Sequence, residues 1–155
     1  MKVVTGLDHI AVTVSDLDRS LAFYKDVMGF KEVERHRLEG ETISRMAGKP
    51  GVIMQVVRLL SPEGPKVLLD LQQYVQPKGT LSNAQLGMAN HSHFCFGVEN
   101  IASAYAKLKA KGVEFVSAPV TFDLGHDSAG VIQVVFLKDP DGFILELVET
   151  PAQAS

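Results

Sequence analysis

Apolar and polar positions alternate along several short segments of this chain, and such alternation indicates β-strands. Turn-forming sequences such as Ser-Pro-Glu-Gly and Asp-Pro-Asp-Gly separate some of these segments. The pattern therefore predicts two successive groups of four strands. The first group covers residues 6–14, 30–38, 52–60 and 66–74, and the second covers residues 92–98, 113–117, 131–137 and 143–148.

Two other stretches have the spacing of an α-helix. Apolar side chains recur at i, i+4, i+7 and i+11 over residues 17–28, and a similar face runs over residues 101–108. Asp16 or Ser15 can cap the first helix, and Asn100 can cap the second. A glycine follows each helix, as is common at helix C-termini. Each helix therefore comes directly after the first strand of its group.

The order of elements is thus the same in both halves of the chain. Each half reads β-α-β-β-β, which predicts an α+β fold of two pseudo-symmetric modules. We expect one domain over residues 1–155, with modules at about 6–75 and 91–149. The polar, Gly- and Pro-bearing stretch at residues 76–90 is the expected linker.

Four polar residues occupy matching places in the two modules. His9 and His93 open similar segments 84 positions apart, and Asp70 and Glu146 close similar segments 76 positions apart. Since side chains alternate along a strand, large apolar neighbours lie on one face and these four residues on the other. We expect the helices to cover the apolar faces, so that all four residues can converge.

Imidazole and carboxylate ligands suit Fe²⁺, Mn²⁺, Co²⁺, Ni²⁺ or Zn²⁺. The predicted ligands of one divalent metal ion are His9, Asp70, His93 and Glu146, with Glu146 and Asp70 also the candidate catalytic groups. Asp is disfavoured inside strands, and an unpaired buried carboxylate is costly, so both acids indicate a functional site. Three choices stay open for the fourth ligand, namely Asp70, Gln72 or neither. A lone His at a strand start can also be purely structural.

Composition narrows the class of protein. With 155 residues, 46% hydrophobic and 21% charged, the chain is typical of a globular domain. A net charge of −3 without a dense basic stripe argues against nucleic acid or a membrane as a partner. The single cysteine, Cys95, excludes an intramolecular disulfide, and no signal-peptide pattern opens the chain. A cytoplasmic location is the expectation.

Two longer stretches are similar to a known family. LDHIAVTVSDLDRSLAFYKDVMGF resembles the opening of vicinal oxygen chelate proteins. That superfamily contains glyoxalase I, methylmalonyl-CoA epimerase, fosfomycin- and bleomycin-resistance proteins and extradiol dioxygenases. NHSHFCFGVENIASAYAKLKAKGVEFVS and VVFLKDPDGFILELVE resemble its second module. The resemblance implies a cupped mixed β-sheet with outer helices and a divalent metal at His9, Asp70, His93 and Glu146.

The sequence therefore predicts a metal-dependent lyase, isomerase or epimerase, closest in pattern to glyoxalase I-like and epimerase-like members. Its small-molecule substrate would chelate the metal through vicinal oxygens, and a homodimer is expected. One alternative is an extradiol-type dioxygenase that uses His9, His93 and Glu146. Another is a metal-free protein that binds a small molecule such as an antibiotic.

Overall fold

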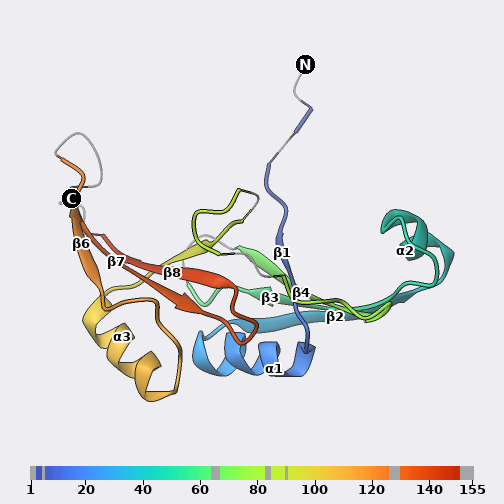
Figure 1. Ribbon diagram of the computed structural model, residues 1–155, viewed down its shortest axis with the longest axis horizontal. Coiled ribbons are helices and arrows are strands. Elements are labelled where there is room, and N and C mark those ends of the chain that lie inside the picture. Colours follow the sequence, from blue (N-terminus) through green and yellow to red (C-terminus); the bar gives the residue numbers. More distant parts are fainter. Residues whose placement is uncertain are drawn as a thin grey trace. The chain divides into compact units, whose positions relative to one another are not determined.

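The computed structural model describes residues 3–4, 6–63, 67–82, 85–89, 91–125 and 130–150. It divides into two compact units, Met1–Ser82 and Asn83–Ser155, each built around its own four-stranded sheet (Figure 1). The predicted linker, residues 76–90, begins at the last residue of a strand, and three of its residues lie outside the described ones. No helix in the described part of the chain has the length and apolar character needed to cross a membrane.

The first unit has the predicted β-α-β-β-β order with one additional helix. Its sheet has the strand order β1-β4-β3-β2, in which β1 and β4 are parallel and the other neighbours antiparallel. The elements are β1 (Ile10–Thr13), α1 (Leu17–Ala22), the π-helical turn η1 (Phe23–Val27), β2 (Lys31–Glu39), α2 (Glu41–Met46), β3 (Ile53–Leu60) and β4 (Leu68–Gln76).

The second unit repeats this arrangement. Its strand order is β5-β8-β7-β6, again with one parallel pair, β5 and β8. The elements are β5 (Phe94–Gly97), α3 (Ile101–Ala110), β6 (Val120–Asp123), β7 (Val131–Lys138) and β8 (Ile144–Glu149). The predicted α+β fold of two similar modules is confirmed.

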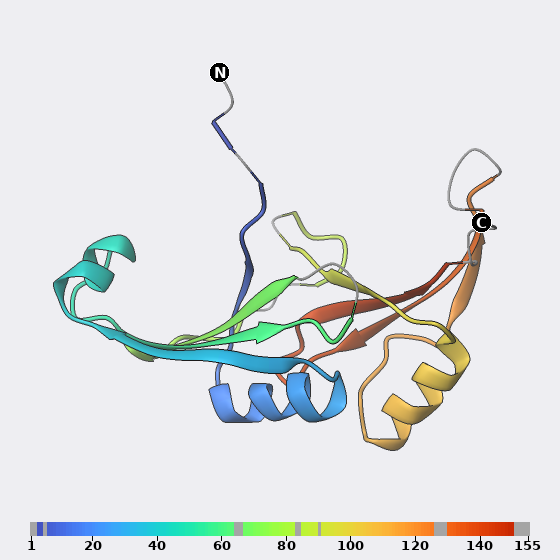
Figure 2. The ribbon, with the colours of Figure 1, turned by 180° about the vertical axis from the view of Figure 1, so that it is seen from behind.

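The helices α1 and α3 each cover the apolar face of their own sheet. In the first unit, α1 lies on one side of the sheet and the short helix α2 on the other (Figure 1). In the second unit, α3 lies on one side of β7 and β8, as the view from behind also shows (Figure 2). Buried residues that alternate along the strands form these cores; they include Leu69 and Leu71 in the first unit and Leu145 and Leu147 in the second. Burying each such side chain contributes about 1.5–3 kcal/mol.

The two helices begin in the same way, which shows how closely the units correspond. Asp16 caps α1 and Asn100 caps α3, each by accepting a hydrogen bond from a backbone N–H three residues later. The first backbone N–H of α1 donates to Gln73 Oε1 at 3.3 Å. The first backbone N–H of α3 donates to Glu149 Oε2 at 2.7 Å. The last strand of each unit therefore fixes the start of its helix.

Two predictions of secondary structure differ from the structure. Residues 113–117 were expected to form a strand, but Phe115 makes only an isolated bridge to Leu137, and the strand β6 begins later, directly after Pro119. The alternation at 113–117 instead places Phe115 against Tyr105 of α3, with ring centroids 4.6 Å apart.

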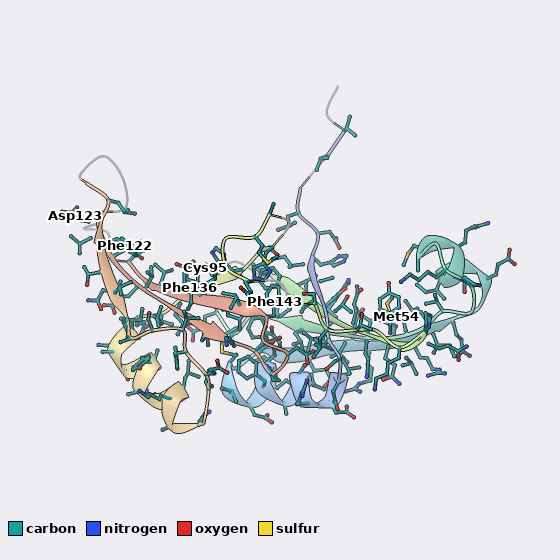
Figure 3. All side chains as sticks on the ribbon, in the orientation of Figure 1. Met54, Cys95, Phe122, Asp123, Phe136 and Phe143 are labelled. Carbon is teal, nitrogen blue, oxygen red and sulfur yellow. The ribbon has the colours of Figure 1, made fainter. Side chains whose placement is uncertain are left out.

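The other difference is α2, which the sequence pattern did not predict. Only Ile43 of this helix is buried, so the segment has no helical periodicity to detect. Ile43 packs with Val52, Met54 and Val56 on the sheet face opposite α1, and Met54 is labelled in Figure 3. This small cluster closes one end of that face.

Candidate functional site

In the first unit, His9 and Asp70 come together as the repeat predicts. His9 precedes β1, Asp70 lies in β4, and His9 Nε2 is 3.7 Å from Asp70 Oδ2. The other ring nitrogen, Nδ1, is 2.7 Å from Asp8 Oδ2. This hydrogen bond lowers the pKa of Asp8 and leaves the Nε2 side of the ring toward Asp70. Asp70 is buried between two apolar neighbours, Leu69 and Leu71.

Asp70 has a stronger partner than His9. Arg58 Nε donates to Asp70 Oδ1 at 2.7 Å, and Arg58 Nη2 donates to Asp70 Oδ2 at 2.8 Å. The two residues face each other across the antiparallel pair of β3 and β4. Two parallel hydrogen bonds from one guanidinium are a strong, charge-assisted arrangement for a carboxylate. These hydrogen bonds raise the pKa of Arg58.

The second unit brings the other predicted pair together. His93 precedes β5, Glu146 lies in β8, and His93 Nε2 is 3.1 Å from Glu146 Oε2. The His93 ring also meets the edge of Phe136, with centroids 5.3 Å apart. The side chain of Glu146 is 17% exposed and that of His93 is 43% exposed. The pair is therefore accessible to a ligand.

Cys95 is the third group beside Glu146. The two residues are opposite each other in the parallel pair of β5 and β8. Partial burial of the thiol, followed by the charge and the hydrogen bond of Glu146, raises the pKa of Cys95 to about 12. The thiol therefore stays protonated and serves as a hydrogen-bond donor rather than a nucleophile. Cys95 and Phe136 are labelled in Figure 3.

The donor atoms of the second unit fit a metal ion. Two ligands bonded at about 2.0–2.2 Å to one ion, at roughly right angles, lie about 3 Å apart. The 3.1 Å between His93 Nε2 and Glu146 Oε2 is a direct ion-pair contact, and it is compatible with this separation. The register partners of Glu146 in the adjacent strands are Phe136 and Cys95, so neither of these two positions holds a cation that would repel the ion.

The donor atoms of the first unit fit a metal ion less well. The distance from His9 to Asp70 is acceptable, but both oxygens of Asp70 already accept hydrogen bonds from a cation. Among the described residues, no group of three or more His, Cys, Asp or Glu side chains is arranged to hold a metal. The shared four-ligand site stays a prediction from the repeat, and so does the alternative ligand Gln72.

The repeat singled out all four of these residues for one shared site, and it missed Arg58. A signal was available, because Arg58 is the only charged residue in the strand IMQVVRLL, and burial of a charge requires a partner. The register that places it opposite Asp70 could not be read from the pattern alone.

A model of the Glyoxalase/Bleomycin resistance protein/Dioxygenase superfamily matches residues 6–147. The chain belongs to this superfamily. The match spans both units, and it confirms the resemblance that the two longer sequence stretches indicated.

Curated relatives share about a quarter to a third of their residues with the chain. Lactoylglutathione lyase of Schizosaccharomyces pombe is 31% identical over 151 residues, covering 92% of this chain and 46% of the relative. The chain thus spans about half the length of that relative. A probable lactoylglutathione lyase of Synechocystis sp. is 27% identical over 147 residues, covering 94% of this chain and 95% of the relative.

Solved structures show the same fold. A glyoxalase family protein of Bacillus cereus superposes with a TM-score of 0.80 at 19% identity, covering 97% of both chains. The trypanothione-dependent glyoxalase I of Leishmania major has a TM-score of 0.60 at 24% identity, covering 91% of this chain and 84% of that one. The glyoxalase-like fold predicted from the sequence is therefore confirmed.

Proposed function

We propose that the chain is a metal-dependent lyase or isomerase that acts on a small substrate with two neighbouring oxygen atoms. The observation that carries the proposal is the pair of His93 and Glu146, which holds an imidazole nitrogen and a carboxylate oxygen at ligand spacing. The relatives named lactoylglutathione lyase support this class of reaction.

The proposed metal ligands are His93 and Glu146, and His9 stays the ligand predicted from the first unit. A bound divalent ion of the Fe, Mn, Co, Ni or Zn type would act as a Lewis acid toward the substrate oxygens. Asp8 orients the His9 ring through its 2.7 Å contact with Nδ1, as acids commonly do for metal-binding histidines.

Glu146 is the proposed general base. Its carboxylate is partly exposed, and neither residue opposite it in the neighbouring strands is an arginine or a lysine, so no cation there competes for the proton that it would accept. It would take a proton from the carbon next to a substrate carbonyl and return it to the neighbouring carbon. Asp70 is a poor candidate for this step because Arg58 binds both of its oxygens.

One observation favours an oxygenase as the second candidate. With Asp70 paired to Arg58, the predicted ligands reduce to His9, His93 and Glu146, which is the two-histidine, one-carboxylate set of many iron oxygenases. That set leaves more positions open for substrate and O₂. No observation in the structure favours the metal-free binding protein over these two.

Solvent deuterium exchange measured without O₂ tests the proposal. We expect deuterium to enter a thiohemiacetal, hydroxyketone or acyl-CoA substrate when the wild type carries metal, and Glu146→Gln to abolish the exchange. Oxygen uptake with catechols, in the absence of any exchange across this panel, would favour the oxygenase instead.

The assembly and the location are further parts of the proposal. We propose a homodimer in the cytoplasm, with a small-molecule substrate as the partner. Light scattering at micromolar concentration tests the assembly, and a monomeric mass would contradict it.

A further inference from the structure

The two acids of the repeat have different neighbours in equivalent positions. In the first unit, Asp70 pairs in register with Ala11 on one side and Arg58 on the other. In the second unit, Glu146 pairs with Cys95 and Phe136. A guanidinium therefore occupies the place in the first unit that a phenyl ring occupies in the second.

We propose that Arg58 withholds Asp70 from metal binding, so that the carboxylate of the first unit serves as the anchor of an internal ion pair. This inference rests on the proposed metal-dependent function. It removes one carboxylate from the predicted ligand set. Arg58 would thus decide whether the carboxylate of the first unit can bind a metal ion.

The geometry of the ion pair carries the argument. The bonds of 2.7 and 2.8 Å use both carboxylate oxygens, and the side chain of Asp70 is only 6% exposed. A divalent ion bound at Asp70 would lie next to a fixed positive charge in a place with little water to screen it. The register of β3 and β4 holds Arg58 at this position, so the guanidinium cannot be displaced without removing the partner of a buried charge.

The surrounding charges agree with an internal pair rather than an anion-binding site. Glu34 lies opposite Arg58 in β2, and both Asp8 and Glu34 contribute negative charge near the guanidinium. Because acids surround Arg58, a negatively charged substrate group would be repelled there. The local purpose of Arg58 is therefore to neutralise Asp70.

The test measures Zn²⁺ and Co²⁺ affinity by titration calorimetry and equilibrium dialysis, without any assay of turnover. Removing the cation should release Asp70, so Arg58→Gln should bind metal at least about 10-fold more tightly than the wild type. The glutamine amide can still donate to Asp70, which keeps the carboxylate hydrogen-bonded. Arg58→Met is the second variant in case the first fails to fold, and circular dichroism checks both.

The double variant Arg58→Gln with Asp70→Asn tests whether the gain in metal affinity comes from the released Asp70 carboxylate. Its affinity should return to the wild-type value, because the released carboxylate is gone. Asp70→Asn alone should leave the affinity within about 3-fold of the wild type, less than the effect of a residue next to a ligand.

The outcomes distinguish failure of this inference from failure of the proposed function. If the wild type binds metal and Arg58→Gln gains no affinity, the inference is overturned, while the proposed function stands. A loss of metal in Asp70→Asn would then show that Asp70 is a ligand. If the wild type binds no metal and Arg58→Gln does, the inference stands and the proposed function fails. If neither protein binds metal, both are overturned.

Discussion

The two units build nearly the same scaffold and then treat its two acids differently. In both, the helix begins beside the last strand, and one His lies close to one acid of that strand. Yet Asp70 is buried in a bidentate pair with Arg58, whereas Glu146 contacts His93 and is more exposed. A repeat can therefore conserve geometry while it assigns a structural role to one copy and a chemical role to the other.

The largest expected difference between the acids is in turnover. Glu146→Gln should lower the rate of exchange or lyase chemistry by about 10²–10⁴-fold, the usual loss when a general base is removed. Asp70→Asn should lower it less than about 10-fold, since Asp70 acts only through Arg58. Equal losses in the two variants, measured in well-folded protein, would remove the difference between the two roles.

For the free energy of unfolding, we expect the opposite order, with the larger loss in the Asp70 variant. Asp70→Asn breaks a pair with one buried partner and should lower the free energy of unfolding by about 2–4 kcal/mol, somewhat less than for a fully buried pair. Glu146→Gln breaks a more exposed contact and should cost less than about 1 kcal/mol. Urea denaturation of both variants measures the difference, and a larger loss for Glu146→Gln would contradict it.

The first turns of α1 and α3 provide a test of the similarity between the two units. Gln73→Ala and Glu149→Ala each remove an acceptor from the first backbone N–H of a helix. Each should cost about 1 kcal/mol of unfolding free energy, the usual value of a helix cap. Thermal unfolding of the two variants compares them, and a loss confined to one unit would show that the scaffolds are less equivalent than their hydrogen bonds indicate.

The smallest expected effect concerns Cys95. Because its pKa is raised to about 12, the thiol is protonated at pH 8, and the reactive thiolate forms only as the pH approaches that value. Iodoacetamide should therefore label Cys95 more slowly than a free cysteine, and Glu146→Gln should speed the reaction by removing a negative charge. Rapid labelling of the wild type at pH 8 would contradict the raised pKa of Cys95.

Much of the fold could be predicted from the sequence because strand alternation and helix caps are local patterns, and both occur in each half of the chain. Alternation located seven of the eight strands in the described residues, and Asp16 and Asn100 marked the starts of α1 and α3. The prediction of a strand at residues 113–117 was wrong because alternation alone does not reveal whether a neighbouring strand is present. The helix α2 was missed because its single buried residue leaves no periodic trace.

The repeat in the sequence singled out the four candidate residues, but it did not predict which other side chains contact them. The repeat placed His9 near Asp70 and His93 near Glu146, since equivalent positions in equivalent strands share a face. It could not indicate that Arg58 lies opposite Asp70, because that contact depends on the register of β3 and β4. Strand register is a property of pairing between segments, which a reading of one segment at a time does not contain.

The most direct test of the different roles is one titration of Zn²⁺ into three proteins, namely the wild type, Asp70→Asn and Glu146→Gln. His36→Gln is a suitable control, because His36 is an exposed histidine paired with Glu34. The account predicts that Glu146→Gln weakens binding by more than about 100-fold, while Asp70→Asn and the control stay within about 3-fold of the wild type. Equal weakening by Asp70→Asn and Glu146→Gln would contradict it.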